Sequence, residues 1–147
     1  MKIGVISDTH GLLRPEALDR LAHVDHILHA GDIGAAEVID RLRTVAPVTA
    51  IRGNNDTDGW AQAYPEEAML ELQGRKILVL HDLKTLSETP YDVIVSGHSH
   101  KPNIETKDGV LYLNPGSAGP RRFKLPITVA VLDIDGDQIA AKIHEII

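Results

Sequence analysis

Two histidines stand one residue apart in the stretch VSGHSH (95–100), directly after a strand-like run. Side chains at positions i and i+2 of an extended backbone point the same way, so we expect His98 and His100 to be directed toward one point. Imidazole is the commonest protein ligand for transition metals. The pair alone also fits a polar turn after a buried strand. The residues that follow the other strand-like runs distinguish a metal site from such a turn.

Polar side chains also follow the other strand-like runs. Each run is short and rich in β-branched residues, and Asp, Asn or His comes soon after it. In open α/β sheets, ligands bind in the crevice beyond the carboxyl ends of the strands. If several of these strands run parallel, their ends bring together the donors of five segments: SDTH (7–10), GD (31–32), GNND (53–56), HD (81–82) and GHSH (97–100).

This donor set predicts a metal centre without thiolate ligands, because the chain has no cysteine. Imidazole and carboxylate suit divalent manganese, iron, nickel, cobalt or zinc. The donors are too many for one tetrahedral zinc ion and suit two ions that share a bridging ligand. Asp32 is the candidate bridge, because each carboxylate oxygen can hold one ion and the neighbouring Gly31 lets other groups approach closely.

The first part of the chain alternates between strand and helix patterns. Near-continuous apolar runs suit strands buried on both faces. A proline opens the first helical pattern, as suits the first turn of a helix. This order predicts right-handed parallel units built from strands at 2–7, 26–30 and 48–52 and helices at 15–24 and 35–45.

After about Gly53 the pattern favours antiparallel strands. Three hairpins are expected, with turns at Gln73-Gly74, at Asp108-Gly109 and around Asp135-Gly136-Asp137. The remaining strand-like run is DVIVS (92–96). We therefore expect one mixed α/β domain over residues 1–147, with two sheets face to face and helices outside.

The composition excludes several classes of protein. The net charge of −6 argues against extended nucleic-acid binding. The only basic cluster is Arg121, Arg122 and Lys124. Arg121 and Arg122 could meet a substrate phosphate, but a solvated loop is the preferred interpretation. No apolar run approaches the ~20 residues that span a bilayer, and the N-terminus is too polar for a secretory signal, so a soluble cytoplasmic protein is expected.

The ordered blocks DTH, GD, GNND, H and GHSH resemble the calcineurin-like metallophosphoesterase superfamily. Its pattern is D-x-H, G-D, G-N-H-[DE], H and G-H-x-H. The NPGS stretch (114–117) and the small size are similar to its compact prokaryotic phosphodiesterase branch. The resemblance covers essentially the whole chain. It implies a metallo-dependent phosphatase-like fold, a mixed two-sheet β-sandwich flanked by helices.

The resemblance also implies the ligands of two divalent metal ions, with manganese expected and nickel, iron, cobalt or zinc as alternatives. The two sets share Asp32. One ion would be held by Asp8, His10, Asp32 and His100. The other would be held by Asp32, Asn54, His81 and His98. His98 and His100 would then serve one centre but different ions.

We expect a metal-dependent phosphoric ester hydrolase in which a hydroxide bridging the two ions attacks the phosphorus. Asn55 departs from the pattern, because the family often has a histidine there that stabilises the transition state and protonates the departing oxygen. An amide can donate a hydrogen bond but cannot deliver a proton. We therefore expect a phosphodiesterase acting on small-molecule phosphodiesters with good leaving groups, with Asn55 and Asp32 as catalytic residues. A homo-oligomer, dimer or tetramer, is also expected.

Several polar residues beside these motifs have two interpretations. His29 could support the centre from behind, although a satisfied buried histidine is preferred. Asp56 and Asp82 could orient neighbouring site groups or simply close turns. The stretch 114–117 is expected to brace the site through its backbone.

The main alternative is a non-catalytic scaffold of the same fold, as one retromer subunit is. Such a protein should have lost ligands, and this chain has the full set. An amidohydrolase with an early HxH motif would need a barrel of roughly 200–250 residues. A mononucleotide-binding switch domain would need a phosphate-binding loop such as GxxxxGK[ST], which the sequence lacks.

Overall fold

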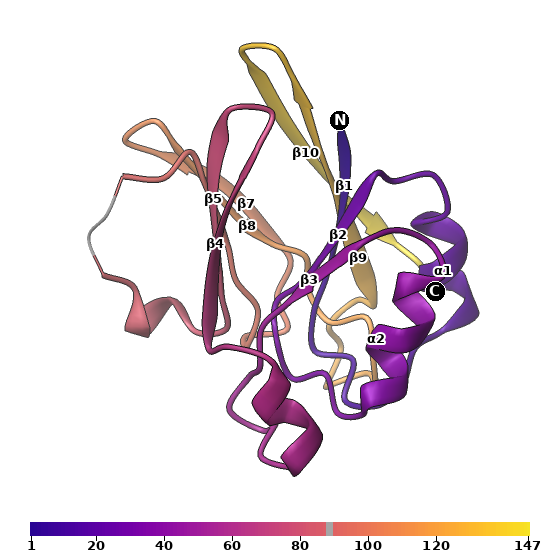
Figure 1. The fold of residues 1–147 in the computed structure, drawn as a ribbon. Helices are drawn as coiled ribbons and strands as arrows, with labels where there is room; N and C mark the ends of the chain where they lie inside the picture. Colours follow the sequence, from indigo (N-terminus) through magenta and orange to yellow (C-terminus); the bar gives the residue numbers. More distant parts are fainter. Residues whose placement is uncertain (88–89) are drawn as a thin grey trace.

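Two five-stranded sheets lie face to face in the computed structural model, which describes residues 1–87 and 90–147 (Figure 1). The first sheet has the order β10-β9-β1-β2-β3 and contains β1 (Lys2–Ile6), β2 (His26–His29), β3 (Val48–Ala50), β9 (Thr128–Asp135) and β10 (Gln138–Glu145). The second has the order β4-β5-β6-β8-β7 and contains β4 (Glu67–Leu72), β5 (Arg75–Leu80), β6 (Val93–Val95), β7 (Asn103–Lys107) and β8 (Val110–Asn114).

Each sheet has a parallel centre with antiparallel strands beside it. In the first sheet β1, β2 and β3 are parallel, and β9 pairs with β1 in the opposite direction. In the second sheet β5, β6 and β8 are parallel, while β4 and β7 are antiparallel to their neighbours. The strands whose carboxyl ends carry the polar motifs are therefore the parallel ones.

The main core lies between the two sheets. Alternate residues of a strand point to opposite faces, and the buried residues follow this rule. Ile77 and Val79 of β5 face the other sheet and pack in a cluster that includes Ile3 and Val5 of β1. The intervening Leu78 packs instead in a smaller cluster on the outer face of the second sheet. Buried strands of this kind explain the continuous apolar runs in the sequence.

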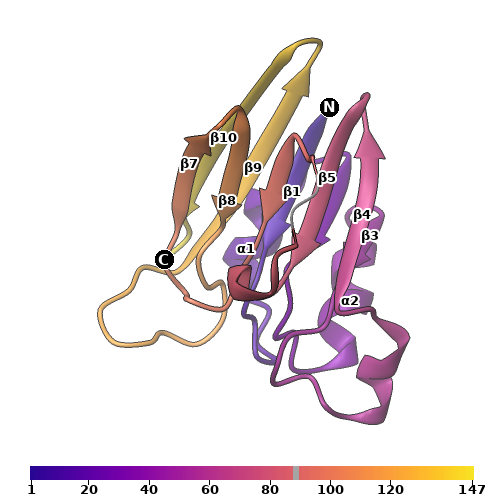
Figure 2. The same cartoon turned by 90° about the vertical axis from the view of Figure 1, so that its left-hand side faces the viewer.

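Helices α1 (Pro15–Arg20) and α2 (Ala36–Arg43) cover the outer face of the first sheet (Figure 2). Pro15 occupies the first turn of α1, where its missing N–H costs no helical hydrogen bond. Two short 3₁₀ helices, η1 (Gly59–Ala63) and η2 (Leu83–Thr85), follow β3 and β5. The predicted sandwich with outer helices is confirmed, but both α-helices are shorter than expected and lie on the same sheet.

The three predicted hairpins are present, and left-handed residues form their turns. Gln73 and Gly74 have φ of 53° and 76°, and Asp108 and Gly109 have φ of 51° and 78°. Positive φ at both central residues matches a type I′ turn, whose twist suits antiparallel strands. Gly136, with φ of 59°, opens the third turn.

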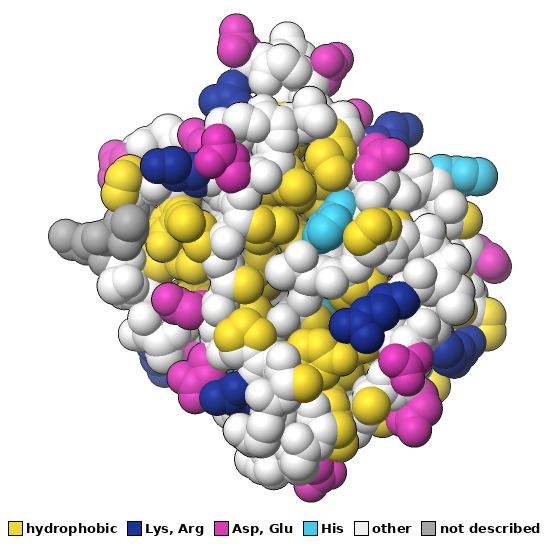
Figure 3. Space-filling view, viewed as in Figure 1, with side chains coloured by type: hydrophobic (Ala, Val, Ile, Leu, Met, Phe, Trp, Pro, Cys, Tyr) yellow, Lys and Arg dark blue, Asp and Glu magenta, His cyan; other side chains and the backbone are white. Residues whose placement is uncertain are grey.

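Within the described residues, no helix has the length and apolar character needed to cross a bilayer. Figure 3 shows Lys and Arg side chains interspersed with Asp and Glu over the face seen in Figure 1. Hydrophobic side chains are exposed along the middle of that face.

Candidate metal centre

The seven predicted ligand residues follow strand ends in both sheets. On the first sheet, Asp8 and His10 follow β1, Asp32 follows β2 and Asn54 follows β3. On the second sheet, His81 follows β5, and His98 and His100 follow β6. The structure brings all seven together where the two sheets meet, linked by the contacts described below.

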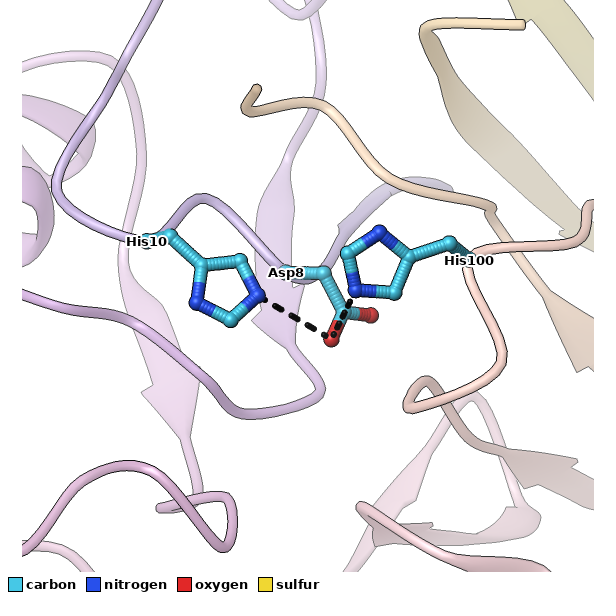
Figure 4. A group of neighbouring side chains, drawn as sticks. All are labelled: Asp8, His10 and His100. Carbon is cyan, nitrogen blue, oxygen red and sulfur yellow. Dashed lines mark ion pairs between the residues drawn. The ribbon is translucent and has the colours of Figure 1, made fainter. Parts of the chain in front are cut away.

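Asp8 lies between two imidazoles (Figure 4). Its Oδ1 is 3.4 Å from His100 Nε2 and 3.9 Å from His10 Nε2. The rings of His10 and His100 are stacked, with centroids 5.4 Å apart. These three side chains offer one donor atom each within a space that could hold a metal ion.

Asp32 and His81 form the second part of the centre. His81 Nε2 lies 3.2 Å from Asp32 Oδ2, and His98 Nδ1 lies 3.3 Å from the same nitrogen of His81. Asn54 Oδ1 is 3.2 Å from His98 Nδ1. Asp32 Oδ2 is also 3.8 Å from His10 Nε2, so its carboxylate contacts members of both groups.

Asp8 is equally central, since its Oδ1 is also 3.9 Å from His81 Nε2. The three side chains Asp8, Asp32 and His81 form a second group that could hold an ion. The predicted ligand sets assign Asp8 to one ion only, whereas this geometry puts it within reach of both groups.

The residues fit bound cations better than an empty polar site. Asp8 Oδ1 and His10 Nε2 are buried, and neither has a hydrogen-bond partner among the described residues. A buried unpaired carboxylate oxygen carries a large desolvation cost. A divalent cation between these atoms would satisfy both, because each presents a lone pair.

The local charges favour ionised Asp32. Burial opposes its charged form, but hydrogen bonds from His81 and from the Asn55 backbone lower the pKa of Asp32 to about 2. Burial instead raises the pKa of Asp8. For His100, burial together with the nearby Arg122 lowers the pKa to about 4. His100 is therefore neutral at physiological pH, which is the form that binds a metal.

The backbone around the centre is unusual. Asp8, His10, Asp32, His98 and His100 all have positive φ, between 47° and 71°. Non-glycine residues seldom adopt this left-handed conformation, and such residues cluster at functional sites. The expected extended backbone at His98 and His100 is wrong, because β6 ends at Val95 and both histidines lie in a left-handed loop. The loop directs His98 toward His81 and His100 toward Asp8.

Glycines allow the motif loops to approach one another. A Cβ on Gly31, whose φ is 96°, would lie 2.7 Å from His81 Nδ1. A Cβ on Gly97 would lie 2.8 Å from Asp8 Oδ2 and would also collide with the Ser7 hydroxyl. Only glycine permits this spacing without a shift of the ligands.

Asn55 contacts the candidate bridging residue through two groups. Its backbone N–H donates to Asp32 Oδ1 at 3.0 Å, and its side-chain amide donates to Asp32 Oδ2 at 3.1 Å. Asn55 itself is exposed. The side chain is therefore engaged with Asp32 at the rim of the centre.

His29, Asp56 and Asp82, for which the sequence left two interpretations, contact the loops that carry the candidate ligands. Buried His29 contacts the Thr9 hydroxyl through Nε2 and accepts from the Gly31 N–H through Nδ1. Asp56 is buried and accepts hydrogen bonds from three backbone N–H groups. Asp82 caps η2 and lies 3.9 Å from His98 Nε2. The side-chain amide of Asn114 donates to the carbonyl of Gly97, so Asn114 braces the loop that carries His98 through its side chain and not through its backbone as expected.

Sequence reasoning missed two hydroxyl residues beside Asp8. Ser7 is fully buried and donates to Asp8 Oδ2 at 2.8 Å. Thr9 is also fully buried and donates to the carbonyl of Ile33, next to Asp32. Both residues flank Asp8 in SDTH, and this position next to a candidate ligand could have indicated their role. Ser117, from the NPGS stretch, donates to the Asp8 carbonyl as well.

A sequence model of the calcineurin-like phosphoesterase superfamily domain matches residues 1–137. The chain belongs to this superfamily. It is 36% identical over 159 residues to a probable metallophosphoesterase of Methanothermobacter thermautotrophicus, covering 97% of this chain and 91% of the relative. The resemblance in the sequence motifs and the fold expected from it are thereby confirmed.

Two solved structures share the fold of this metallophosphoesterase. A novel archaeal phosphodiesterase has a TM-score of 0.78 at 26% identity, and the match covers 98% of this chain and 100% of the other. Wild-type Vps29 of Entamoeba histolytica, solved with Zn²⁺, has a TM-score of 0.77 at 23% identity over 98% of this chain and 97% of the other. At that identity Vps29 supports the fold alone.

Proposed function

We propose that the chain is a phosphodiesterase that depends on two divalent metal ions, with manganese as the first candidate. Asp8, His10, Asp32 and His100 would hold one ion, and Asp32, Asn54, His81 and His98 the other. The observation that carries this proposal is the convergence of these donors around Asp8 Oδ1 and His10 Nε2, which are buried without a hydrogen-bond partner in the described part of the chain.

Bound divalent cations would supply a lowered pKa for a nucleophilic water and positive charge for the oxygens of the reacting phosphate. Asp32 would remain ionised, because hydrogen bonds from His81 and Asn55 help to keep the pKa of its carboxyl low. Burial of Asp8 and His81 would exclude water from the inner wall of the centre. The exposed side, at Asn54, Asn55 and His98, would admit the ester.

The chemistry of Asn55 supports a diesterase rather than a monoesterase. Its amide donates to Asp32 and cannot deliver a proton to a departing oxygen. General acid catalysis typically contributes ~10²–10⁴-fold. Esters whose leaving groups depart without protonation would therefore be the better substrates. The similarity to an archaeal phosphodiesterase agrees with this choice.

The test is hydrolysis of bis(p-nitrophenyl) phosphate by the purified protein with added Mn²⁺, compared with p-nitrophenyl phosphate. We expect metal-dependent turnover of the diester that exceeds turnover of the monoester. Metal content of the same sample, measured by mass spectrometry, should approach two ions per chain. A metal-loaded protein that hydrolyses neither ester would overturn the proposal.

A scaffold without catalysis is the second candidate, since Vps29 proteins share the fold. The complete donor set favours the enzyme. One measurement distinguishes the enzyme from the scaffold, because a metal-loaded scaffold would leave the diester intact.

A further inference from the structure

Phe123 is the most exposed large hydrophobic residue among those described, with 89% of its surface accessible. It lies in the loop of residues 119–125, which leads into β9 and is called the Phe123 loop below. Exposure of a whole phenyl ring to water is unfavourable. Packing in this chain therefore does not explain why the ring stands there.

The backbone of Phe123 is also strained. Its φ is 55°, which places a bulky residue in the left-handed region. Among the described non-glycine residues with positive φ, five are candidate ligands of the metal centre and two, Gln73 and Asp108, form hairpin turns. Phe123 is the remaining one in this described set. Strain of this kind points to a functional constraint on the loop.

The ring borders a cavity of about 890 Å³ that reaches the metal centre. This volume is within the usual range of ligand pockets. Its lining includes the apolar residues Phe123 and Leu125, and His98 connects the cavity to the candidate ligands. The lining also includes three cationic residues, Lys101, Arg122 and Lys124.

Three cationic residues around one cavity are unusual in a chain with a net charge of −6. In the described residues, the ion pairs of Lys and Arg side chains with carboxylates involve Arg43, Arg52 and Arg75. Lys101, Arg122 and Lys124 thus face the cavity without a carboxylate partner there. Divalent cations in the centre would already neutralise the single charge of a scissile diester. Three further positive charges suit an additional phosphate group on the substrate.

We propose that the Phe123 loop and Lys101 form a subsite for a nucleotide arm of the substrate. An aromatic base would stack on Phe123, and a phosphate outside the scissile diester would bind Arg122, Lys124 and Lys101. The substrate class is then a short phosphodiester that carries a base and a further terminal phosphate. This inference deepens the proposed function and rests on it.

The first test compares two p-nitrophenyl diesters that differ by one phosphate, the p-nitrophenyl ester of deoxyadenosine 5′-monophosphate and its 3′-phosphorylated form. Their leaving group, p-nitrophenolate, departs without protonation. The wild-type protein with Mn²⁺ should show a KM about tenfold lower for the 3′-phosphorylated form, with a similar kcat. Arg122→Gln/Lys124→Gln should remove this preference. The matched control is Lys107→Gln/Lys142→Gln, which removes two exposed charges away from the cavity and should retain it. Equal KM values for the two diesters in the wild-type protein would overturn the inference.

A binding measurement separates this inference from the proposed activity. Deoxyadenosine 3′,5′-bisphosphate is titrated into the metal-loaded protein in a calorimeter. Phe123→Ala should raise its Kd about tenfold, and Phe123→Trp should restore the wild-type value, because either aromatic ring can stack on a base. An unchanged Kd in Phe123→Ala would refute the stacking role even if the diesterase activity is present. Loss of affinity in that variant would support it even if hydrolysis fails.

Discussion

Asp32 combines an ionised carboxylate with a fixed orientation. Both of its oxygens accept hydrogen bonds from Asn55, and Oδ2 lies near two imidazoles. A carboxylate held in this way loses little freedom when cations bind on either side of it. Its neutral amide analogue would keep the shape and remove the charge.

Asp32→Asn should therefore lose at least one of the two metal ions and lower diesterase activity by roughly 10³-fold or more, because the shared ligand would be removed. Metal content after gel filtration and initial rates with Mn²⁺ check both effects. Asp82→Asn is the matched control, since Asp82 is 3.9 Å from His98 Nε2 but belongs to neither candidate ligand set. Retention of both ions and of activity in Asp32→Asn would remove Asp32 from the bridging role.

Asn55→His should raise turnover of phosphomonoesters with poor leaving groups by at least tenfold, because an imidazole can protonate the departing oxygen. The backbone N–H of residue 55 would still donate to Asp32. Rates with an alkyl phosphomonoester and with bis(p-nitrophenyl) phosphate measure the change in selectivity. Asn55→Ala should leave the ratio of these rates unchanged. An unaltered ratio in Asn55→His would mean that residue 55 does not reach the leaving group.

At the scale of the elements, Asp56 joins the loops that follow β2 and β3. Its carboxylate accepts from Ile33 and Gly34 in one loop and from Gly53 in the other, at 2.9–3.0 Å. These two loops carry Asp32 and Asn54. The fourth residue of GNND thus holds in register the two loops that supply ligands from the first sheet.

Asp56→Ala should lower the free energy of unfolding by about 2–4 kcal/mol, because it leaves three backbone N–H groups without their acceptor. Metal affinity should fall as well, since the two ligand loops would separate. Urea denaturation and metal titration measure these effects. Asp58→Ala removes an exposed carboxylate two residues away and should change neither quantity by much. Wild-type stability in Asp56→Ala would show that the loops are held by other contacts.

The sequence predicted the elements better than the local geometry of the ligand loops. Apolar runs followed by Asp, Asn or His located six strands, three in each sheet, because a buried strand is a continuous apolar run and its end is polar. The parallel direction was expected for β1, β2 and β3. The parallel pairing of β5, β6 and β8 was not, because the pattern after Gly53 favoured antiparallel strands. No sequence pattern indicated the left-handed backbone of His98 and His100, because this conformation depends on contacts with Asp8 and His81. The exposure of Phe123 and its place beside His98 were likewise invisible, because they depend on how two distant loops meet.

At the scale of the molecule, the metal centre lies on the seam between the two sheets. Asp8, Asp32 and Asn54 come from the first sheet, and His81 and His98 from the second. Cations bound there would link the sheets at one end of the sandwich, in addition to the core between them. Metal binding should therefore stabilise the whole fold.

Saturating Mn²⁺ should raise the melting temperature relative to protein treated with a chelator. At 100 times Kd, one bound ligand contributes about 2.7 kcal/mol, or roughly 5–10 °C for a chain of this size. Differential scanning calorimetry measures the shift. Asp32→Asn should show a much smaller one. A melting temperature that does not respond to metal in the wild-type protein would argue against cations on the seam.

The three hairpin turns lie at the end of the sandwich opposite the metal centre. β5 and β8 start at two of these turns and end beside the ligands, and β9, antiparallel to β1, ends at the third. A short epitope or a dye-labelling peptide inserted into any of these turns would project away from the candidate metal centre. The protein could then be immobilised on a bead or chip through these turns, with the metal centre open to the solution.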